Sequence, residues 1–212
     1  MKIIEHVSKN LPFISSVPEN NSNYLGIIFL LHGFGASMQD LVDIAPMINK
    51  DDYIFIFPNA PFEMSFGLNQ KGYSWFDFDN LSQISKSQKI LENTIEESLK
   101  LFNIDDNKMY LGGFSQGGMM AMHSDLIHQN LFSGYIILSS KIIPNIDINI
   151  NLKTDPRIFL AHGVNDSIID IYDARETQNK LINRGLDVEY HEYEMEHQII
   201  ESELNDIKNW LL

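Results

Sequence analysis

The chain has 212 residues, a formal net charge of −14 and no cysteine. This length suits one domain with a sizeable hydrophobic core, so we expect a single domain over residues 1–212. The lack of cysteine excludes disulfides, cysteine-ligated metal centres and a thiol nucleophile. The acidic balance argues against nucleic acid and anionic membranes as partners, because lysine and arginine are what bind phosphate groups.

Targeting and membrane-spanning segments are not evident in the sequence. Glu5 and His6 stand where a signal peptide needs its apolar centre. The longest strongly apolar stretch, residues 27–31, is far too short to span a membrane. We therefore expect a cytoplasmic protein with no stable membrane insertion.

Short apolar runs alternate with longer amphipathic patterns along the chain. The short runs predict strands over residues 25–31, 53–57, 108–111, 135–138, 157–161 and 186–193, with an antiparallel edge strand over 2–7. The amphipathic patterns predict helices over residues 38–49, 84–102, 116–128, 172–183 and 201–212. This alternation is typical of an α/β fold in which helices cover both faces of a mostly parallel sheet. Ligands of such sheets bind at the carboxyl ends of the strands.

Two stretches do not fit the alternation. Residues 58–81 form a long segment that is rich in aromatic side chains, which we interpret as a loop packed over an apolar surface. Residues 141–154 contain several isoleucines at partly alternating spacing. They predict either an extra strand or a flap beside the functional site.

A glycine-flanked serine, Gly113-Phe114-Ser115-Gln116-Gly117, follows the strand predicted over 108–111 and precedes a predicted helix. Strand, sharp turn and helix are the context of a nucleophile elbow, which lifts a serine hydroxyl clear of the sheet. Large side chains two positions either side of the serine would collide with neighbouring strands. An ordinary glycine-rich turn is the alternative interpretation of this pentapeptide.

A nucleophilic serine needs a histidine base and an orienting carboxylate, and after an elbow the chain order is serine, acid, histidine. His197 follows the last predicted strand, whereas His191 lies inside that strand, so we favour His197 as the base. Asp166 follows the strand over 157–161 and is the favoured acid. Asp170 and Asp173 are rivals, although a role in the first turn of the next helix explains both.

The oxyanion formed in acyl transfer requires backbone N–H donors. One should be the N–H of Gln116, directly after the nucleophile. The other should come from His32-Gly33-Phe34-Gly35, directly after the strand over 25–31, with Phe34 as the favoured donor. Met119, on the helix after Ser115, should belong partly to the core and partly to the lining of the substrate pocket. We recognise no metal-ligand spacing, and no metal is expected.

These motifs together resemble the phospholipase/carboxylesterase family of α/β-hydrolases, which includes bacterial carboxylesterases and acyl-protein thioesterases. The resemblance runs from about residue 25 to the C-terminus. It rests on the segments already quoted and on further ones, namely Asp40-Leu41, Ala45-Pro46, Pro58-Asn59-Ala60-Pro61, Trp75-Phe76-Asp77, His162-Gly163 followed by Asp166, and Met195-x-His197.

The resemblance implies an α/β-hydrolase fold with three α/β/α layers and a serine esterase that needs no cofactor. It assigns Ser115, Asp166 and His197 to the catalytic triad, and Phe34 and Gln116 to the oxyanion hole. It also places Trp75 near the acyl groove, where a buried anchor of the loop is an equal alternative. Dimers occur in the family, so a homodimer is a further expectation.

We therefore expect a serine carboxylesterase acting on short- to medium-chain acyl esters or thioesters, with a small-molecule or lipid-like substrate. An acyl-protein thioesterase or lysophospholipase acting on long acyl chains is the main alternative. A peptidase and a non-catalytic ligand-binding protein on the same fold are weaker alternatives.

Overall fold

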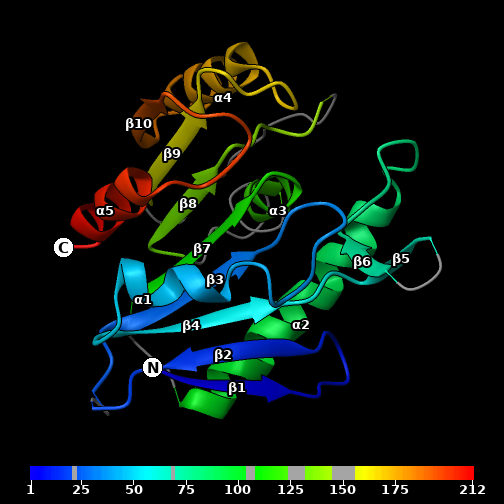
Figure 1. Cartoon of the computed structure of the whole chain (residues 1–212), viewed down its shortest axis with the longest axis vertical. Helices are drawn as coiled ribbons and strands as arrows, with labels where there is room; N and C mark the ends of the chain where they lie inside the picture. The colour runs from blue at the N-terminus through cyan, green and yellow to red at the C-terminus, as the bar shows by residue number, and fades with distance from the viewer. Residues whose placement is uncertain (21–22, 68–69, 104–107, 124–131, 145–155) are drawn as a thin grey trace.

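The computed structural model describes residues 1–20, 23–67, 70–103, 108–123, 132–144 and 156–212. At its centre is a sheet whose eight described strands follow the order β1-β2-β4-β3-β7-β8-β9-β10 (Figure 1). The strands are β1 (Lys2–His6), β2 (Phe13–Val17), β3 (Gly26–Leu31), β4 (Tyr53–Pro58), β7 (Lys108–Phe114), β8 (Gly134–Leu138), β9 (Arg157–Gly163) and β10 (Asp187–Tyr193). Neighbours from β4 to β10 pair in parallel, whereas β1 and β2 pair antiparallel at one edge.

Helices cover both faces of this sheet. On one face lie α2 (Gln83–Phe102), α3 (Gln116–Ala121) and α4 (Ile171–Ile182), and on the other lie α1 (Ala45–Ile48) and α5 (Glu201–Trp210). Alternate residues of β3 serve the two faces: Ile27 and Phe29 pack in one core, Ile28 and Leu30 in the other. Strands buried on both faces explain the continuous apolar runs. The predicted three-layer α/β arrangement is confirmed.

The antiparallel edge strand is confirmed as β1, but its partner β2 was not predicted. In β2 the buried positions include Ser15 and Ser16, which are 0% and 1% exposed. The Ser15 hydroxyl lies 2.8 Å from Nε2 of His6 on the neighbouring strand. Two buried serines conceal the apolar pattern by which a strand is recognised.

The helix predicted over residues 38–49 is wrong in its extent. Only a short 3₁₀ turn, Val42–Ile44, and the four-residue α1 are helical there. Pro46 has no backbone N–H and stands in the first turn of α1, so a single helix cannot run through it. The apolar spacing that suggested one long helix reflects burial instead, because Leu41, Ala45 and Ile48 all pack in one core.

The stretch over residues 58–81 is not a plain loop. It contains an antiparallel hairpin of β5 (Phe62–Phe66) and β6 (Gln70–Ser74), which projects from the body of the molecule (Figure 1). Of the segment over 141–154, residues 145–154 lie outside the described residues, as do residues 124–128 of the helix predicted over 116–128. Of the helices described, none combines the length and apolar character that a membrane crossing requires.

Candidate active site

Ser115 lies at the sharp turn between β7 and α3. Its φ and ψ are 55° and −119°, a conformation that side-chain-bearing residues rarely adopt. The Ser115 N–H donates a 2.9 Å hydrogen bond to the carbonyl of Leu138 at the end of β8. The Ser140 hydroxyl donates to the Ser115 carbonyl at 2.7 Å. The surroundings therefore hold the strained serine from both of its backbone polar groups.

Glycine is required on both sides of this turn. A Cβ on Gly117 would lie 2.0 Å from the carbonyl oxygen of Leu31, and one on Gly113 would lie 2.5 Å from the backbone of Gly117. Real Cβ atoms do not approach backbone this closely. The close approach is what the predicted elbow needs, because α3 must start directly against β3 and β7.

Asp166 follows β9 in a short loop. Its Oδ2 lies 2.7 Å from Nδ1 of His197, and its Oδ1 accepts backbone hydrogen bonds from Ile168 at 2.8 Å and Ile169 at 2.9 Å. Burial acts to raise the pKa of the Asp166 carboxyl, but the hydrogen bonds from His197 and the two N–H groups outweigh it and hold the pKa below its usual range. Asp166 is therefore a carboxylate that can orient the imidazole and stabilise its charged form.

The loop that carries His197 is bonded directly to the loop that carries Asp166. The N–H of Val164 donates to the carbonyl of Tyr193 at 2.9 Å, and the N–H of Asn165 donates to that of Met195 at 3.1 Å. A Cβ on Gly163 would lie 2.3 Å from the same Met195 carbonyl oxygen. This close pairing fixes the base relative to its acid.

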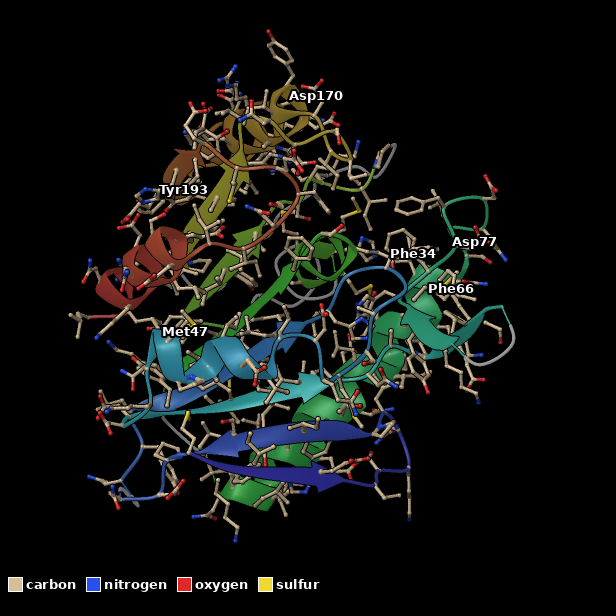
Figure 2. The ribbon with its side chains drawn as sticks, viewed as in Figure 1. Phe34, Met47, Phe66, Asp77, Asp170 and Tyr193 are labelled. Atoms are coloured by element: carbon tan, nitrogen blue, oxygen red, sulfur yellow. The ribbon has the colours of Figure 1, made fainter. Side chains whose placement is uncertain are left out.

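The other candidates for the base and the acid make their contacts elsewhere in the structure. His191 stacks on Phe159 with 5.0 Å between ring centroids, inside β10. Asp170 caps the N-terminus of α4 (Figure 2), and Asp173 pairs with the ammonium of Lys141 at 2.6 Å. The structure thus brings His197, and not His191, to the predicted acid.

His32 is the first residue of the predicted oxyanion loop, residues 32–35, and is fully buried. Its Nε2 accepts the N–H of Ala60 at 3.0 Å, which leaves the proton on Nδ1 to donate to the carbonyl of Gly33 at 2.8 Å. Burial lowers the pKa of His32 to about 4, against the smaller opposing effect of the Gly33 hydrogen bond. The neutral imidazole of His32 therefore holds the backbone of this loop in place directly before Phe34.

Gln116 and Trp75 join the elbow to the segment after β6. The Gln116 side chain accepts the N–H of Trp75 at 2.9 Å and donates to the carbonyl of Phe76 at 2.7 Å. The Gln116 N–H lies in the first turn of α3, where a backbone N–H has no partner inside the helix.

Trp75, which the resemblance places near the acyl groove, is 0% exposed, and its indole N–H donates to the carbonyl of His32 at 2.9 Å. Its side chain packs in the core. The alternative role, a buried anchor of the loop, fits this position.

The β5–β6 hairpin was not predicted, and it holds the oxyanion loop from outside. The N–H of Gly35 donates to the carbonyl of Tyr73 at 2.9 Å, and the N–H of Tyr73 donates to that of Ala36 at 2.8 Å. The side chain of Phe34 is 47% exposed and projects beside this hairpin (Figure 2). The alternation of the large apolar residues Phe62, Met64 and Phe66 was the signal for the missed strand.

A pocket of about 280 Å³ opens beside Ser115. Its described lining consists of Phe34, Phe78, Ser115, Gln116, Met119, Lys141, Ile168 and Ile169. Met119 is 2% exposed and also packs in the core, and its predicted contact with a substrate stays a prediction. In the described part of the chain, no group of three or more histidine, aspartate or glutamate side chains is arranged to hold a metal ion.

Comparison with known proteins agrees with this geometry. The model of the Phospholipase/Carboxylesterase family matches residues 13–212. The chain belongs to this family. It is therefore a hydrolase with the α/β-hydrolase fold.

Members and structural neighbours of the family resemble the chain over nearly its whole length. Acyl-protein thioesterase 1 of Emericella nidulans is 29% identical, over 87% of this chain and 88% of the relative. The crystal structure of esterase PE8 aligns with a TM-score of 0.81 at 24% identity, over 97% of this chain and 98% of that one. The Bacillus cereus carboxylesterase aligns with a TM-score of 0.79 at 20% identity, over 96% and 94%.

Proposed function

We propose that the chain is a serine carboxylesterase that hydrolyses short- to medium-chain acyl esters or thioesters through an acyl-enzyme. One observation carries the proposal. A strained serine at the end of β7 shares the carboxyl edge of the sheet with a histidine whose Nδ1 lies 2.7 Å from a buried carboxylate. This combination is what a serine nucleophile requires.

In the first half of the reaction, Ser115 Oγ attacks the acyl carbon while its proton passes to Nε2 of His197. The negative charge that develops on the acyl oxygen is stabilised by the N–H groups of Phe34 and Gln116. The tetrahedral intermediate then collapses, and the alcohol or thiol leaves with the proton from His197.

In the second half, water replaces the alcohol or thiol. His197 accepts a proton from the water as its oxygen attacks the acyl-enzyme, and then returns that proton to Ser115 Oγ as the acid leaves. Throughout, the Asp166 carboxylate keeps the imidazole in the tautomer with its proton on Nδ1 and stabilises the imidazolium.

A long-chain thioesterase or lysophospholipase is the second candidate, because curated relatives at 26–29% identity are named acyl-protein thioesterase 1 and lysophospholipase-like protein 1. A series of p-nitrophenyl esters and matched thioesters from acetyl to palmitoyl separates the two. We expect kcat/KM to be highest at eight carbons or fewer. A maximum at palmitoyl would replace the main proposal with the second, and hydrolysis of a matched peptide but not of any ester would replace both with a peptidase.

A further inference from the structure

The pocket beside Ser115 contains one feature that simple hydrolysis of an alkyl ester does not require. Lys141 is the only charged side chain among its described lining residues, in a wall otherwise made largely of aromatic and aliphatic groups. Its ammonium lies 2.6 Å from Oδ2 of Asp173, and the two side chains are only 26% and 36% exposed. The ion pair is therefore partly withdrawn from water, and Lys141 belongs to the wall of the pocket beside Ser115.

Lys141 is fixed in place rather than free to swing into solvent. Asp173 and Thr177 stand one turn apart on α4, and the Thr177 hydroxyl, 2% exposed, accepts the N–H of Ile142 at 3.1 Å. On the other side, the Ser140 hydroxyl donates to the carbonyl of Ser115. The segment 140–142 thus holds the ammonium at a set position relative to the nucleophile.

An ammonium has three N–H donors, and Asp173 accepts from one of them. Where these donors face the pocket, an alkyl chain that fills it would cover them and take their water away, which costs free energy. A carbonyl or hydroxyl oxygen on the acyl chain would instead accept from them. A carboxylate is less suitable, because Asp173 already balances the charge of Lys141.

The geometry points to Lys141 as a specificity-determining residue that selects short acyl groups bearing an uncharged oxygen acceptor, such as oxoacyl esters, over plain alkyl chains. This inference rests on the proposed esterase function and deepens it by naming the substrate class.

Matched p-nitrophenyl esters test the inference: 4-oxopentanoate against pentanoate, 5-oxohexanoate against hexanoate, and 6-oxoheptanoate against heptanoate. For each pair the ratio of kcat/KM, oxoacyl over alkyl, is measured in the wild type and in Lys141→Met. We expect the substitution to lower the ratio about tenfold for at least one pair, and to raise kcat/KM for heptanoate. Equal ratios in the two proteins for all three pairs would overturn the inference.

Two further variants sharpen the result. Lys180→Met breaks the 2.8 Å pair with Glu176 on the same helix, outside the described pocket lining, and should leave every ratio unchanged. Asp173→Asn removes the balancing charge, so hydrolysis of a hemisuccinate ester relative to pentanoate should rise about tenfold. No rise would contradict the placement of the ammonium in the acyl pocket, even if Lys141→Met fails to fold.

Failure of this inference is distinguishable from failure of the proposed function. If the wild type hydrolyses p-nitrophenyl acetate and reacts with a fluorophosphonate while the ratios stay unchanged, only the role of Lys141 is rejected. If the wild type does neither, the esterase proposal itself falls, and the inference falls with it.

Discussion

At the scale of single residues, the proposed nucleophile differs in exposure from the side chains that hold the loops around it. Ser115 is only partly buried, while the residues that fix the loops around it, Gln116, Trp75 and His32, are all at most 1% exposed. Each of these buried polar groups is matched by a backbone partner. Rigid support of this kind keeps oxyanion donors in position before the reaction starts.

Replacing the nucleophile should remove catalysis and little else. For Ser115→Ala we expect kcat on a p-nitrophenyl ester to fall by about 10⁴–10⁶, because the loss of a serine nucleophile has costs of this order. Within the described part of the chain no hydrogen bond depends on this hydroxyl, and alanine keeps the Cβ and therefore the backbone strain at φ 55°, so the melting temperature should stay within a few degrees. Retention of most of the activity would remove Ser115 from the mechanism.

The two late histidines offer an internal comparison. His197→Ala should lower kcat by a similar factor, about 10⁴ or more, because the serine loses its base. His191→Ala, which removes a ring stacked on Phe159 and bonded to Glu189 at 2.9 Å, should leave kcat within about threefold. Steady-state kinetics of both variants decides between them, and the opposite pattern would move the base to His191.

At the scale of elements, the β5–β6 hairpin holds the predicted oxyanion loop in place through backbone hydrogen bonds. A Cβ on Gly72 would lie 2.0 Å from the carbonyl oxygen of Gly35, next to the two hydrogen bonds between Tyr73 and the loop. Gly72→Ala should therefore displace the N–H of Phe34 and lower kcat by about 10²–10³, the usual cost of one oxyanion donor, with little change in KM.

Gly67→Ala is the matched control for this variant, because it makes the same chemical change in the same hairpin. Among the described residues a Cβ there meets no atom within 4 Å, although its φ of 71° makes the substitution strained. We expect it to cost a little stability and to leave kcat unchanged. If both variants lost activity equally, the effect would come from the hairpin as a whole and not from contact with the oxyanion loop.

Elements that are buried on both faces were predictable from the sequence, and elements with mixed surroundings were not. Strands such as β3 and β4 appear as unbroken apolar runs because helices cover both of their faces. By contrast, two of the buried positions of β2 are Ser15 and Ser16, so this strand has no continuous apolar run. The β5–β6 hairpin pairs with none of the described strands of the main sheet. Where Pro46 interrupts residues 38–49, apolar periodicity alone was misleading.

The same distinction applies to the site. Chain order and position after a strand were enough to predict that Asp166 and His197 meet, because parallel strands bring their carboxyl ends to one edge of the sheet. The buried role of Trp75 was not decidable, since a single aromatic residue in a long loop fits both a groove wall and an anchor. Its hydrogen bond to His32 depends on contacts between distant segments, which spacing does not encode.

At the scale of the whole molecule, one buried acid limits stability. Glu203 on α5 is 0% exposed, Oε1 of its carboxyl has no partner among the described residues, and burial followed by the charge of Asp206 raises its pKa to about 8. Because the folded pKa lies above the unfolded value of about 4.5, folding favours the protonated form. The associated stability is fully present below about pH 4.5 and is lost as the pH rises to about 8.

Glu203→Gln keeps the shape of the side chain but cannot ionise. We expect it to raise the melting temperature by about 3–8 °C at pH 8 and to change it little at pH 4, where the wild-type acid is protonated in both states. Calorimetry across this range checks the sign. An increase of the same size at both pH values would show that ionisation of Glu203 is not the cause.

The central claim is that Ser115 is a reactive nucleophile, and covalent labelling tests it most directly. The protein is treated with a fluorophosphonate, digested, and mapped by mass spectrometry. We expect a stable adduct on the peptide that contains Ser115, with no labelling of Ser115→Ala and much slower labelling of His197→Ala. An unlabelled wild-type protein, or an adduct on another residue with Ser115 untouched, would contradict it.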